Sequence, residues 1–490
     1  MDKLICARDY EKAHLADIGR EERPAYHVSP AMGWMNDPNG FSYYKGKYHI
    51  FYQYYPYDTK WGPMHWGHYT TTDFVRWEFL PAALAPDEAY ESGCYSGSAV
   101  ETEDGRHLIM YTAHLEKELG NGENQTLETQ CIAVGDGVDY VKYEKNPVLT
   151  AEDLPDGGSP ADFRDPKIWI ENGVYYCVTV NMAPDQSGQV LLYSSEDGYQ
   201  WNFVRVLESC RNEYGEMWEC PDFFRLGEKA VIMVSPMHMK ARELEFHSGH
   251  NVIGLIGSCS TDDFVFCREA VQNIDYGFDF YASQSTEAAD GRRIMTAWMQ
   301  CWASSTCQPA HAKWFSMLTF PRELTLRDGK LIQNPVRELE TYRQNHVGYT
   351  DYIVEGMCEP EGISGRIADV EVTVKAGSSE GKEFVAYMAA DEEVFTSFHC
   401  DLERDIITVD RSRSGLRHDI VSRRQFGFRK KDGDVKLRFL LDRFSIELFV
   451  NDGEQAFSMC IYDTPTDSDR IRFYADRPVK IDVEKYDIIV

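Results

Sequence analysis

The chain has 490 residues and a formal net charge of −30, from 80 acidic and 50 basic side chains. This length exceeds what a single hydrophobic core usually holds and suits two domains. A surface this acidic repels the phosphate groups of nucleic acids and of anionic membranes, which argues against both as partners and favours a neutral ligand.

The N-terminal residues contain no apolar run of signal-peptide length, and no stretch is long enough to cross a bilayer. The 13 cysteines are odd in number, and none forms a CxxC pair or a Cys/His cluster with zinc spacing. These features predict a cytoplasmic protein with reduced thiols and no membrane contact.

Five segments of the first 300 residues share one pattern: a strand-like stretch, a tight turn with glycine and a second, apolar or aromatic strand-like stretch. Strand pairs that recur about every 60 residues are typical of the blades of a β-propeller with four strands each. The turn glycines are Gly46, Gly105, Gly173, Gly227 and Gly291.

An acidic turn followed by an aromatic residue also recurs, at residues 73–77, 197–201 and, more weakly, 263–266. We expect each to be a hairpin between the outer strands of one blade. An array of β-sandwiches would explain the strands equally well, but not the shared repeat position of three acids described below.

From about residue 350 the pattern changes to period-two alternation, as in Val370, Val372 and Val374, and residues 451–453 form a hairpin turn. This pattern is typical of antiparallel strands in a β-sandwich with one face buried. The sequence therefore predicts an all-β protein, with a five-bladed propeller at 1–330, a polar linker with a helical turn at 331–348 and a β-sandwich at 349–490.

Three acids share one place in the repeats. Counting back eight or nine residues from the first, third and fourth turn glycines reaches Asp37, Asp165 and Glu219, and the same count in the second repeat reaches Ser96. Radial stacking would bring these positions together at one axis. Each motif alone also reads as an ordinary turn, surface ion pair or strand-edge acid.

Three converging carboxyl groups suit glycoside hydrolysis, which needs one to protonate the leaving oxygen and one to attack the anomeric carbon or activate water. The third can bind sugar hydroxyls. Aromatic and polar side chains complete a sugar site, although most of them are also ordinary packing residues. The candidates are Gln53, Trp61, Trp66, Tyr95, Ser96 and Trp298.

Motifs along the whole chain resemble glycoside hydrolase family 32, the β-fructofuranosidases. The block from Gly33 to Gly40 and the Glu219-Cys220-Pro221 motif are the most specific in combination. Further matching residues are 23–24, 26–27, 53, 61–63, 66–68, 95–99, 164–166, 275–277, 279–282, 321–324 and 445–453.

The resemblance implies a five-bladed propeller with a β-sandwich and a retaining double displacement without cofactor or metal. It implies that Asp37 is the nucleophile, Glu219 the general acid and base, and Asp165 the transition-state stabiliser, oriented by Arg164. Retention predicts Asp37 and Glu219 carboxyl groups about 5–5.5 Å apart. The implied substrate-binding shell is Asn36, Gln53, Trp61, Tyr95, Ser96, Arg164, Asp275 and Trp298.

Tyr95 departs from the phenylalanine that many members carry before Ser-Gly-Ser. The resemblance implies hydrolysis of sucrose or short fructo-oligosaccharides, and sucrose 6-phosphate is an alternative if Lys240, Arg242 or Lys313 lies near the glucose unit. A fructosyltransferase, an inverting arabinofuranosidase or xylosidase, and a non-catalytic sugar-binding propeller are the other readings. The sandwich could form a homodimer contact or brace the propeller.

Overall fold

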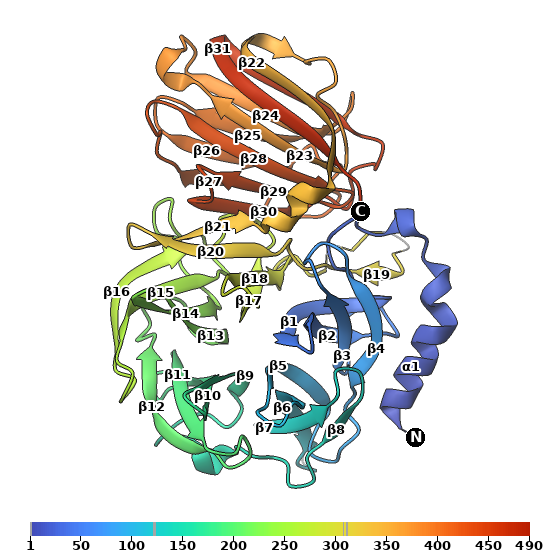
Figure 1. Cartoon of the computed structure of the whole chain (residues 1–490), viewed down its shortest axis with the longest axis vertical. Coiled ribbons are helices and arrows are strands. Elements are labelled where there is room, and N and C mark those ends of the chain that lie inside the picture. Colours follow the sequence, from blue (N-terminus) through green and yellow to red (C-terminus); the bar gives the residue numbers. More distant parts are fainter. Residues whose placement is uncertain (1, 121–123, 307, 310–311) are drawn as a thin grey trace.

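The computed structural model describes residues 2–120, 124–306, 308–309 and 312–490. Five small sheets form a ring, and a larger β-sandwich lies beside it (Figure 1). This confirms the predicted all-β fold with a five-bladed propeller and a C-terminal sandwich. Within the described ranges, no helix is both long and apolar enough to cross a membrane.

Each blade is an antiparallel sheet of four strands that follow one another from the axis outward. The blades are β1 (Gly33–Tyr44), β2 (Lys47–Tyr55), β3 (His65–Thr71), β4 (Glu78–Leu84); β5 (Gly93–Glu101), β6 (His107–Glu118), β7 (Asn124–Gly135), β8 (Tyr140–Lys142); β9 (Phe163–Glu171), β10 (Val174–Met182), β11 (Gly188–Ser195), β12 (Asn202–Ser209); β13 (Trp218–Leu226), β14 (Lys229–Pro236), β15 (Ile253–Cys259), β16 (Phe266–Asn273); and β17 (Tyr281–Glu287), β18 (Arg293–Trp298), β20 (Arg322–Arg327), β21 (Lys330–Pro335).

The predicted turn glycines all join the innermost strand of a blade to its second strand. All five have a positive φ, between 61° and 82°. At four of them a Cβ would meet nothing within 4 Å, so the backbone conformation and not the available space favours glycine there. The four are Gly46, Gly105, Gly227 and Gly291.

The predicted acidic turns join the third and fourth strands of their blades. Asp73 Oδ1 accepts hydrogen bonds from the backbone N–H groups of Val75 and Arg76, and Asp197 Oδ1 does the same for Tyr199 and Gln200. The short carboxylate thus replaces the ladder partners that the backbone loses as it reverses direction.

The ring closes because each innermost strand packs against the next, from β1 through β5, β9, β13 and β17 back to β1. A short strand, β19 (Trp314–Phe315), leaves the fifth blade and pairs in parallel with β1 on its inner edge. The chain then returns to add β20 and β21 to the fifth blade. The first and last blades are therefore joined by backbone hydrogen bonds.

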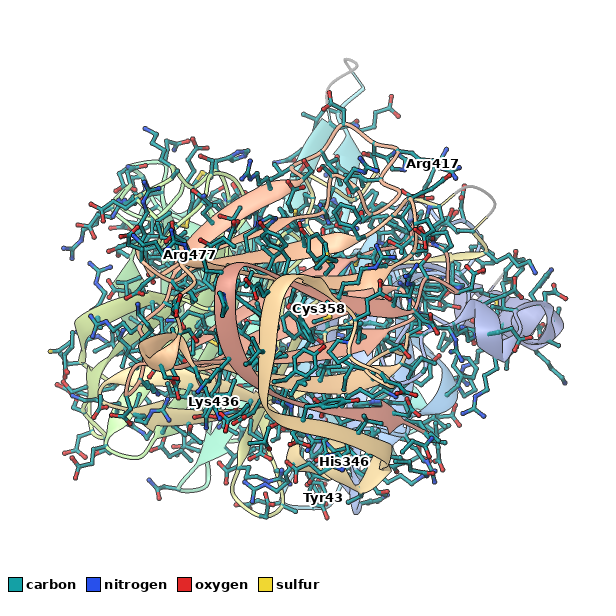
Figure 2. The ribbon with its side chains drawn as sticks, turned by 90° about the horizontal axis from the view of Figure 1, so that it is seen from above. Tyr43, His346, Cys358, Arg417, Lys436 and Arg477 are labelled. Carbon is teal, nitrogen blue, oxygen red and sulfur yellow. The ribbon has the colours of Figure 1, made fainter. Side chains whose placement is uncertain are left out.

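The sandwich buries one core between two layers that share the long strand β31. β31 pairs with β24 along its first half and with β23 along its second half, while β22 runs beside it (Figure 2). Phe398 and Phe439 meet across the core with ring centroids 5.0 Å apart. The strands are β22 (Arg343–Cys358), β23 (Ala368–Val374), β24 (Glu383–Ala390), β25 (Thr396–Asp401), β26 (Ile406–Asp410), β27 (Arg423–Gly427), β28 (Val435–Asp442), β29 (Ser445–Val450), β30 (Gln455–Cys460) and β31 (Arg470–Ile488).

The segment 331–348, predicted as a linker, carries three elements: most of β21, the 3₁₀ helix η4 (Arg337–Tyr342) and the start of β22. Its polar composition reflects edge strands and an exposed turn. The sequence motifs did not include the N-terminal helix α1 (Lys3–His14), which packs on β4 (Figure 1). The remaining 3₁₀ helices are η1 (Leu15–Asp17), η2 (Arg20–Glu22), η3 (Ala151–Asp153) and η5 (Ala376–Ser378).

Ion pairs are buried where the sandwich meets the propeller. Arg322 of the fifth blade donates to Asp275 Oδ2 at 2.9 Å and to Glu447 Oε2 at 2.6 Å, and all three side chains are fully buried. His27 lies between Asp442 and Glu447, with both ring nitrogens 2.9 Å from a carboxylate oxygen. Strand β29 is consequently buried on both faces, whereas its alternation predicted only one buried face.

Candidate active site

Every innermost strand has a bulge at the same level of the ring. At this level, two residues of the innermost strand fall out of register with the second strand. Such bulges bend the strand and re-aim its side chains. The bulge gives a physical reason for the repeat position shared by the acids. The bulged pairs are Asn36-Asp37, Tyr95-Ser96, Asp165-Pro166, Cys220-Pro221 and Ala282-Ser283, and Glu219 is the last paired residue before its bulge.

Three of these residues adopt the left-handed backbone region: Asp165 at φ 62°, Cys220 at φ 48° and Ala282 at φ 52°. This region costs a non-glycine residue on the order of 1 kcal/mol and is often found at functional sites. Hydrogen bonds from their backbone N–H groups hold all three: Asp165 donates to Thr112 Oγ1 at 2.9 Å, Cys220 to Asp165 Oδ2 at 2.8 Å, and Ala282 to Ser235 Oγ at 3.1 Å.

The Asp37 carboxylate is oriented by contacts to both oxygens. Ser96 Oγ donates to Oδ2 at 2.8 Å, and Asn36 Nδ2 donates to Oδ1 at 3.1 Å. Trp34 Nε1 donates to Asn36 Oδ1 at 2.7 Å and so fixes the amide. Cys220 Sγ lies 3.4 Å from Asp37 Oδ2, so Cys220 touches Asp37 through its thiol and Asp165 through its backbone.

Glu219 has a donor at each carboxylate oxygen. Tyr281 Oη donates to Oε2 at 2.7 Å, and Arg164 lies 3.4 Å from Oε1. Arg164 also contacts Glu128 at 3.1 Å and Asp162 at 3.3 Å. One arginine therefore connects Glu219 to carboxylates of the neighbouring blade and loop, and it lies next to Asp165 in the chain.

Burial and mutual repulsion set the protonation of the cluster. Burial, followed by the charge of Glu219, raises the pKa of Asp37 to about 6. Burial also raises the pKa of Asp165 to about 8, because the stabilising charge of Arg164 is outweighed by burial and by the repulsion of Glu219 and Asp37. The cluster thus retains a proton at neutral pH, while Asp37 is ionised above about pH 6.

This arrangement can perform acid–base and nucleophilic chemistry on a bound ligand. It combines one oriented carboxylate that is ionised at neutral pH, Asp37, with a second carboxyl group, Asp165, that holds a proton nearby. Within the part of the chain that the structure describes, no group of three or more His, Cys, Asp or Glu side chains is arranged to hold a metal ion.

The structure brings most of the predicted binding residues to this cluster. Gln53 is buried and donates to the Cys94 carbonyl at 3.1 Å, behind the bulge that carries Ser96. Trp61 is 49% exposed, and its ring meets Tyr95 edge-on with centroids 6.2 Å apart. The other face of Tyr95 stacks on His114 at 4.1 Å. Trp61 and Tyr95 thus form an aromatic wall beside the bulge of the second blade.

Two predicted binding residues lie elsewhere. Asp275 is bound in the domain interface by Arg322, by Ser458 and by the Gly277 N–H group, and its carboxylate has no contact with the three acids. Trp298 is completely buried: its Nε1 donates to Ser316, and its ring packs 6.1 Å from Trp34. The sequence identified both positions as candidates but could not show the direction in which the side chains point.

Two of the three basic residues considered for a phosphorylated substrate make their contacts away from the three acids. Lys313 lies beside the Asp17 carbonyl and Glu22, and Arg242 stacks on Tyr214 at 4.7 Å. Lys240 is exposed.

Sequence reasoning gave no role to Tyr281, Cys220 or Thr112, which position the acids. Tyr281 and Cys220 lie in the quoted motifs, so their proximity to Glu219 could have been inferred. Thr112 lies on the second strand of its blade, without a motif, and no sequence signal identifies it.

Comparisons with known proteins agree with this geometry. Residues 27–335 match the family model described as "Glycosyl hydrolases family 32 N-terminal domain", and residues 338–488 match the family 32 C-terminal model. A sucrose-6-phosphate hydrolase of Zymomonas mobilis is 36% identical over 470 residues, covering 92% of this chain and 88% of the relative. A raffinose invertase of Escherichia coli is 35% identical, covering 92% of each chain.

Solved structures resemble the whole molecule. A Bombyx mori GH32 beta-fructofuranosidase superimposes with a TM-score of 0.82 at 33% identity, covering 99% of this chain and 98% of the other. A mutant of the same enzyme in complex with sucrose gives a TM-score of 0.83 with the same identity and coverage.

Proposed function

This chain belongs to glycoside hydrolase family 32, and on that premise we propose that it is a β-fructofuranosidase (EC 3.2.1.26) that releases fructose from the non-reducing end of sucrose and short fructo-oligosaccharides. The observation that carries the proposal is the contact of Cys220 with both Asp37 and Asp165, next to Glu219. Three carboxyl groups from three blades thereby meet around one bulge.

In this proposal Asp37 attacks the anomeric C2 of the fructosyl unit. Its two oriented oxygens, and its ionised state above about pH 6, suit a nucleophile. The C2–O bond breaks as a proton passes from Glu219 to the leaving oxygen, and a covalent fructosyl ester forms on Asp37. Water, deprotonated by Glu219, then attacks C2 and releases Asp37 as a carboxylate.

Asp165 is proposed to bind fructose hydroxyls most strongly in the transition state. Arg164 lies next to it in the chain and contacts Glu219, so one guanidinium orients the acid–base group and lowers the electrostatic cost of several carboxylates in one site. Asn36, Gln53, Trp61, Tyr95 and Ser96 would form the fructose-binding shell and its aromatic wall.

The preference for sucrose rests on the relative named an invertase and on the similar structure in complex with sucrose, whereas the relatives named sucrose-6-phosphate hydrolases support the phosphorylated sugar as the alternative. The contacts of Arg242 and Lys313 do not favour a phosphorylated substrate. A cytoplasmic location is part of the same proposal. Fructosyl transfer on the same triad is the second candidate, because only the acceptor differs.

The deciding experiment is fructose release from sucrose, sucrose 6-phosphate, kestose, inulin and levan. Release from sucrose or kestose that Asp37→Ala abolishes would support the proposal. Asp139→Asn is the matched control, because Asp139 is a surface acid with a side chain 69% exposed. No release from any of these sugars would overturn the proposal, and oligosaccharide products at high sucrose would indicate transfer.

The role of Glu219 can be tested separately. Glu219→Ala should lose activity on sucrose but keep more of it on a fructoside whose leaving group needs no protonation. Equal losses on both substrates would contradict the assignment of Glu219 as the acid.

A further inference from the structure

His114 lies between the aromatic wall of the candidate site and the arginine that contacts Glu219. It belongs to β6, two residues after Thr112, so the two side chains point to the same face of the strand. On β7, Glu128 is the register partner of His114, and Gln130 is that of Thr112. Two cross-strand pairs of the second blade therefore lie next to each other.

These two pairs hold the start of β9, the strand that carries Arg164 and Asp165. Gln130 Nε2 donates to the Phe163 carbonyl at 2.7 Å. Glu128 Oε2 accepts from the Phe163 N–H group and from Arg164 Nη1, each at 3.1 Å. The position of Arg164 beside the acids therefore depends on where Glu128 is held.

The ring nitrogens of His114 lie beside two carboxylates. Nδ1 is 3.2 Å from Glu128 Oε1, and Nε2 is 3.2 Å from Glu116 Oε1. A carboxylate only accepts hydrogen bonds, so Nδ1 is the donor to Glu128. The Glu116 side chain is 42% exposed and screened by water, whereas that of Glu128 is 3% exposed. His114 thus holds the oxygen of Glu128 that Phe163 and Arg164 do not contact.

The face of the same ring supports the aromatic wall. His114 stacks on Tyr95 with centroids 4.1 Å apart and planes 9° from parallel, and Trp61 meets Tyr95 edge-on at 6.2 Å. Among the described residues, the Tyr95 hydroxyl has no hydrogen-bond partner, so ring packing and not a polar contact sets the orientation of Tyr95.

We propose that His114 is a positioning residue that couples the aromatic wall to the acid–base group of the β-fructofuranosidase activity proposed above, on which this role rests. Its ring face fixes the wall, and its Nδ1 fixes Glu128, which holds Arg164 within 3.4 Å of Glu219. The orientation of the sugar and the protonation of its leaving oxygen would then depend on one imidazole.

Two variants separate the two contacts in steady-state kinetics on sucrose. His114→Phe keeps a ring for Tyr95 but removes the donor to Glu128. Arg164 is then the nearest charged partner of that carboxylate and should move away from Glu219, so kcat should fall about tenfold while KM changes by less than about twofold.

His114→Asn makes the complementary change. The amide nitrogen of asparagine takes the place of Nδ1 beside Glu128, whereas the stacked ring is lost. KM should therefore rise about fivefold, as expected for the loss of an aromatic pair, and kcat should stay within about twofold. His399→Phe is the matched control, because His399 lies 3.3 Å from Glu383 and 6.4 Å from the Tyr387 ring on the sandwich. It should alter neither constant.

The opposite division of the effects between the two variants distinguishes positioning from a merely structural role. A structural role would lower kcat in both variants with KM unchanged, because only the folded fraction would fall, and this result would overturn the proposal. Wild-type constants in both variants would overturn it equally.

Crystal structures of the same variants give a readout that does not depend on activity. Arg164 should lie farther from Glu219 in His114→Phe, and the Tyr95 ring should be displaced from Trp61 in His114→Asn. Side chains that stay in place would overturn the coupling. An absence of fructose release by the unaltered protein would contradict the proposed function instead, so the two failures are distinguishable.

Discussion

Two groups of buried carboxylates in this molecule show opposite electrostatics. At the domain interface each acid faces a cation: contacts with Arg322 and His27 lower the pKa of Glu447 to about 2 despite its burial, and His27 also lowers that of Asp442. At the bulges the acids face one another, and the pKa values of Asp37 and Asp165 rise. Pairing makes the first group a stabilising contact, whereas repulsion makes the second chemically responsive at a cost in stability.

The largest expected effect is on turnover. Asp37→Asn should lower kcat by at least about 10⁴-fold, because the proposed nucleophile is lost while Ser96 and Asn36 keep their positions. Steady-state kinetics on sucrose, with circular dichroism to verify the fold, would measure it. Near-normal turnover of Asp37→Asn would contradict the catalytic role of the carboxylates at the bulges.

Changes at the domain interface should lower the stability of the protein and leave its turnover unchanged. Glu447→Gln leaves Arg322 and His27 without their shared counter-ion, so we expect the free energy of unfolding to fall by about 3–5 kcal/mol. Urea unfolding at pH 7 would measure this loss. The control is Glu403→Gln, which breaks an exposed ion pair with Lys382 and should cost less than about 1 kcal/mol.

The same interface predicts a pH dependence of stability. The pKa of His27 rises to about 9, because hydrogen bonds to Asp442 and Glu447 outweigh its burial. Its contribution, about 3 kcal/mol, is complete below the unfolded pKa of about 6.5 and is lost as the pH rises through about 9. Unfolding between pH 6 and pH 10 should show this loss, and His27→Gln should flatten it. An equal slope in the variant would contradict the assignment.

Neutralising a carboxylate of the catalytic group should raise the stability of the protein, which is the opposite of the effect at the interface. With a pKa of about 8, Asp165 must take up a proton on folding at pH 7, and Asp165→Asn removes this cost, so the free energy of unfolding at pH 7 should rise by about 1–3 kcal/mol. At the same time kcat should fall far more than KM rises, because the interaction is strongest in the transition state. A variant that is both less stable and fully active would contradict the contrast between the repelling acids at the bulges and the paired acids at the domain interface.

The smallest expected effect is the loss of activity at acidic pH. Asp37 must be ionised to attack, and its pKa is about 6, so kcat/KM should decline as the pH falls through this value, by about tenfold for each unit below it. A pH–rate profile with sucrose would measure the decline. An activity that is constant down to pH 4 would contradict it.

The sequence predicted those parts of the molecule that repeat. Turn glycines, acidic turns and the shared position of Asp37, Asp165 and Glu219 recur in several blades, and recurrence identifies them without any long-range contact. Contacts that occur only once in the molecule could not be predicted in this way. No neighbouring residue in the sequence indicates that Asp275 faces the sandwich or that Trp298 packs on Trp34. The second buried face of β29 likewise depends on a partner more than 100 residues away.

The short strand β19 determines when the propeller can close during synthesis of the chain. The strand that bears Asp37 leaves the ribosome well before residues 314–315, yet its inner edge is paired only after those residues have emerged. A nascent or truncated chain that ends within the fourth blade would carry all three acids but an open ring. Catalytic activity should therefore appear abruptly and late in translation, which would keep an immature chain from acting on its substrate.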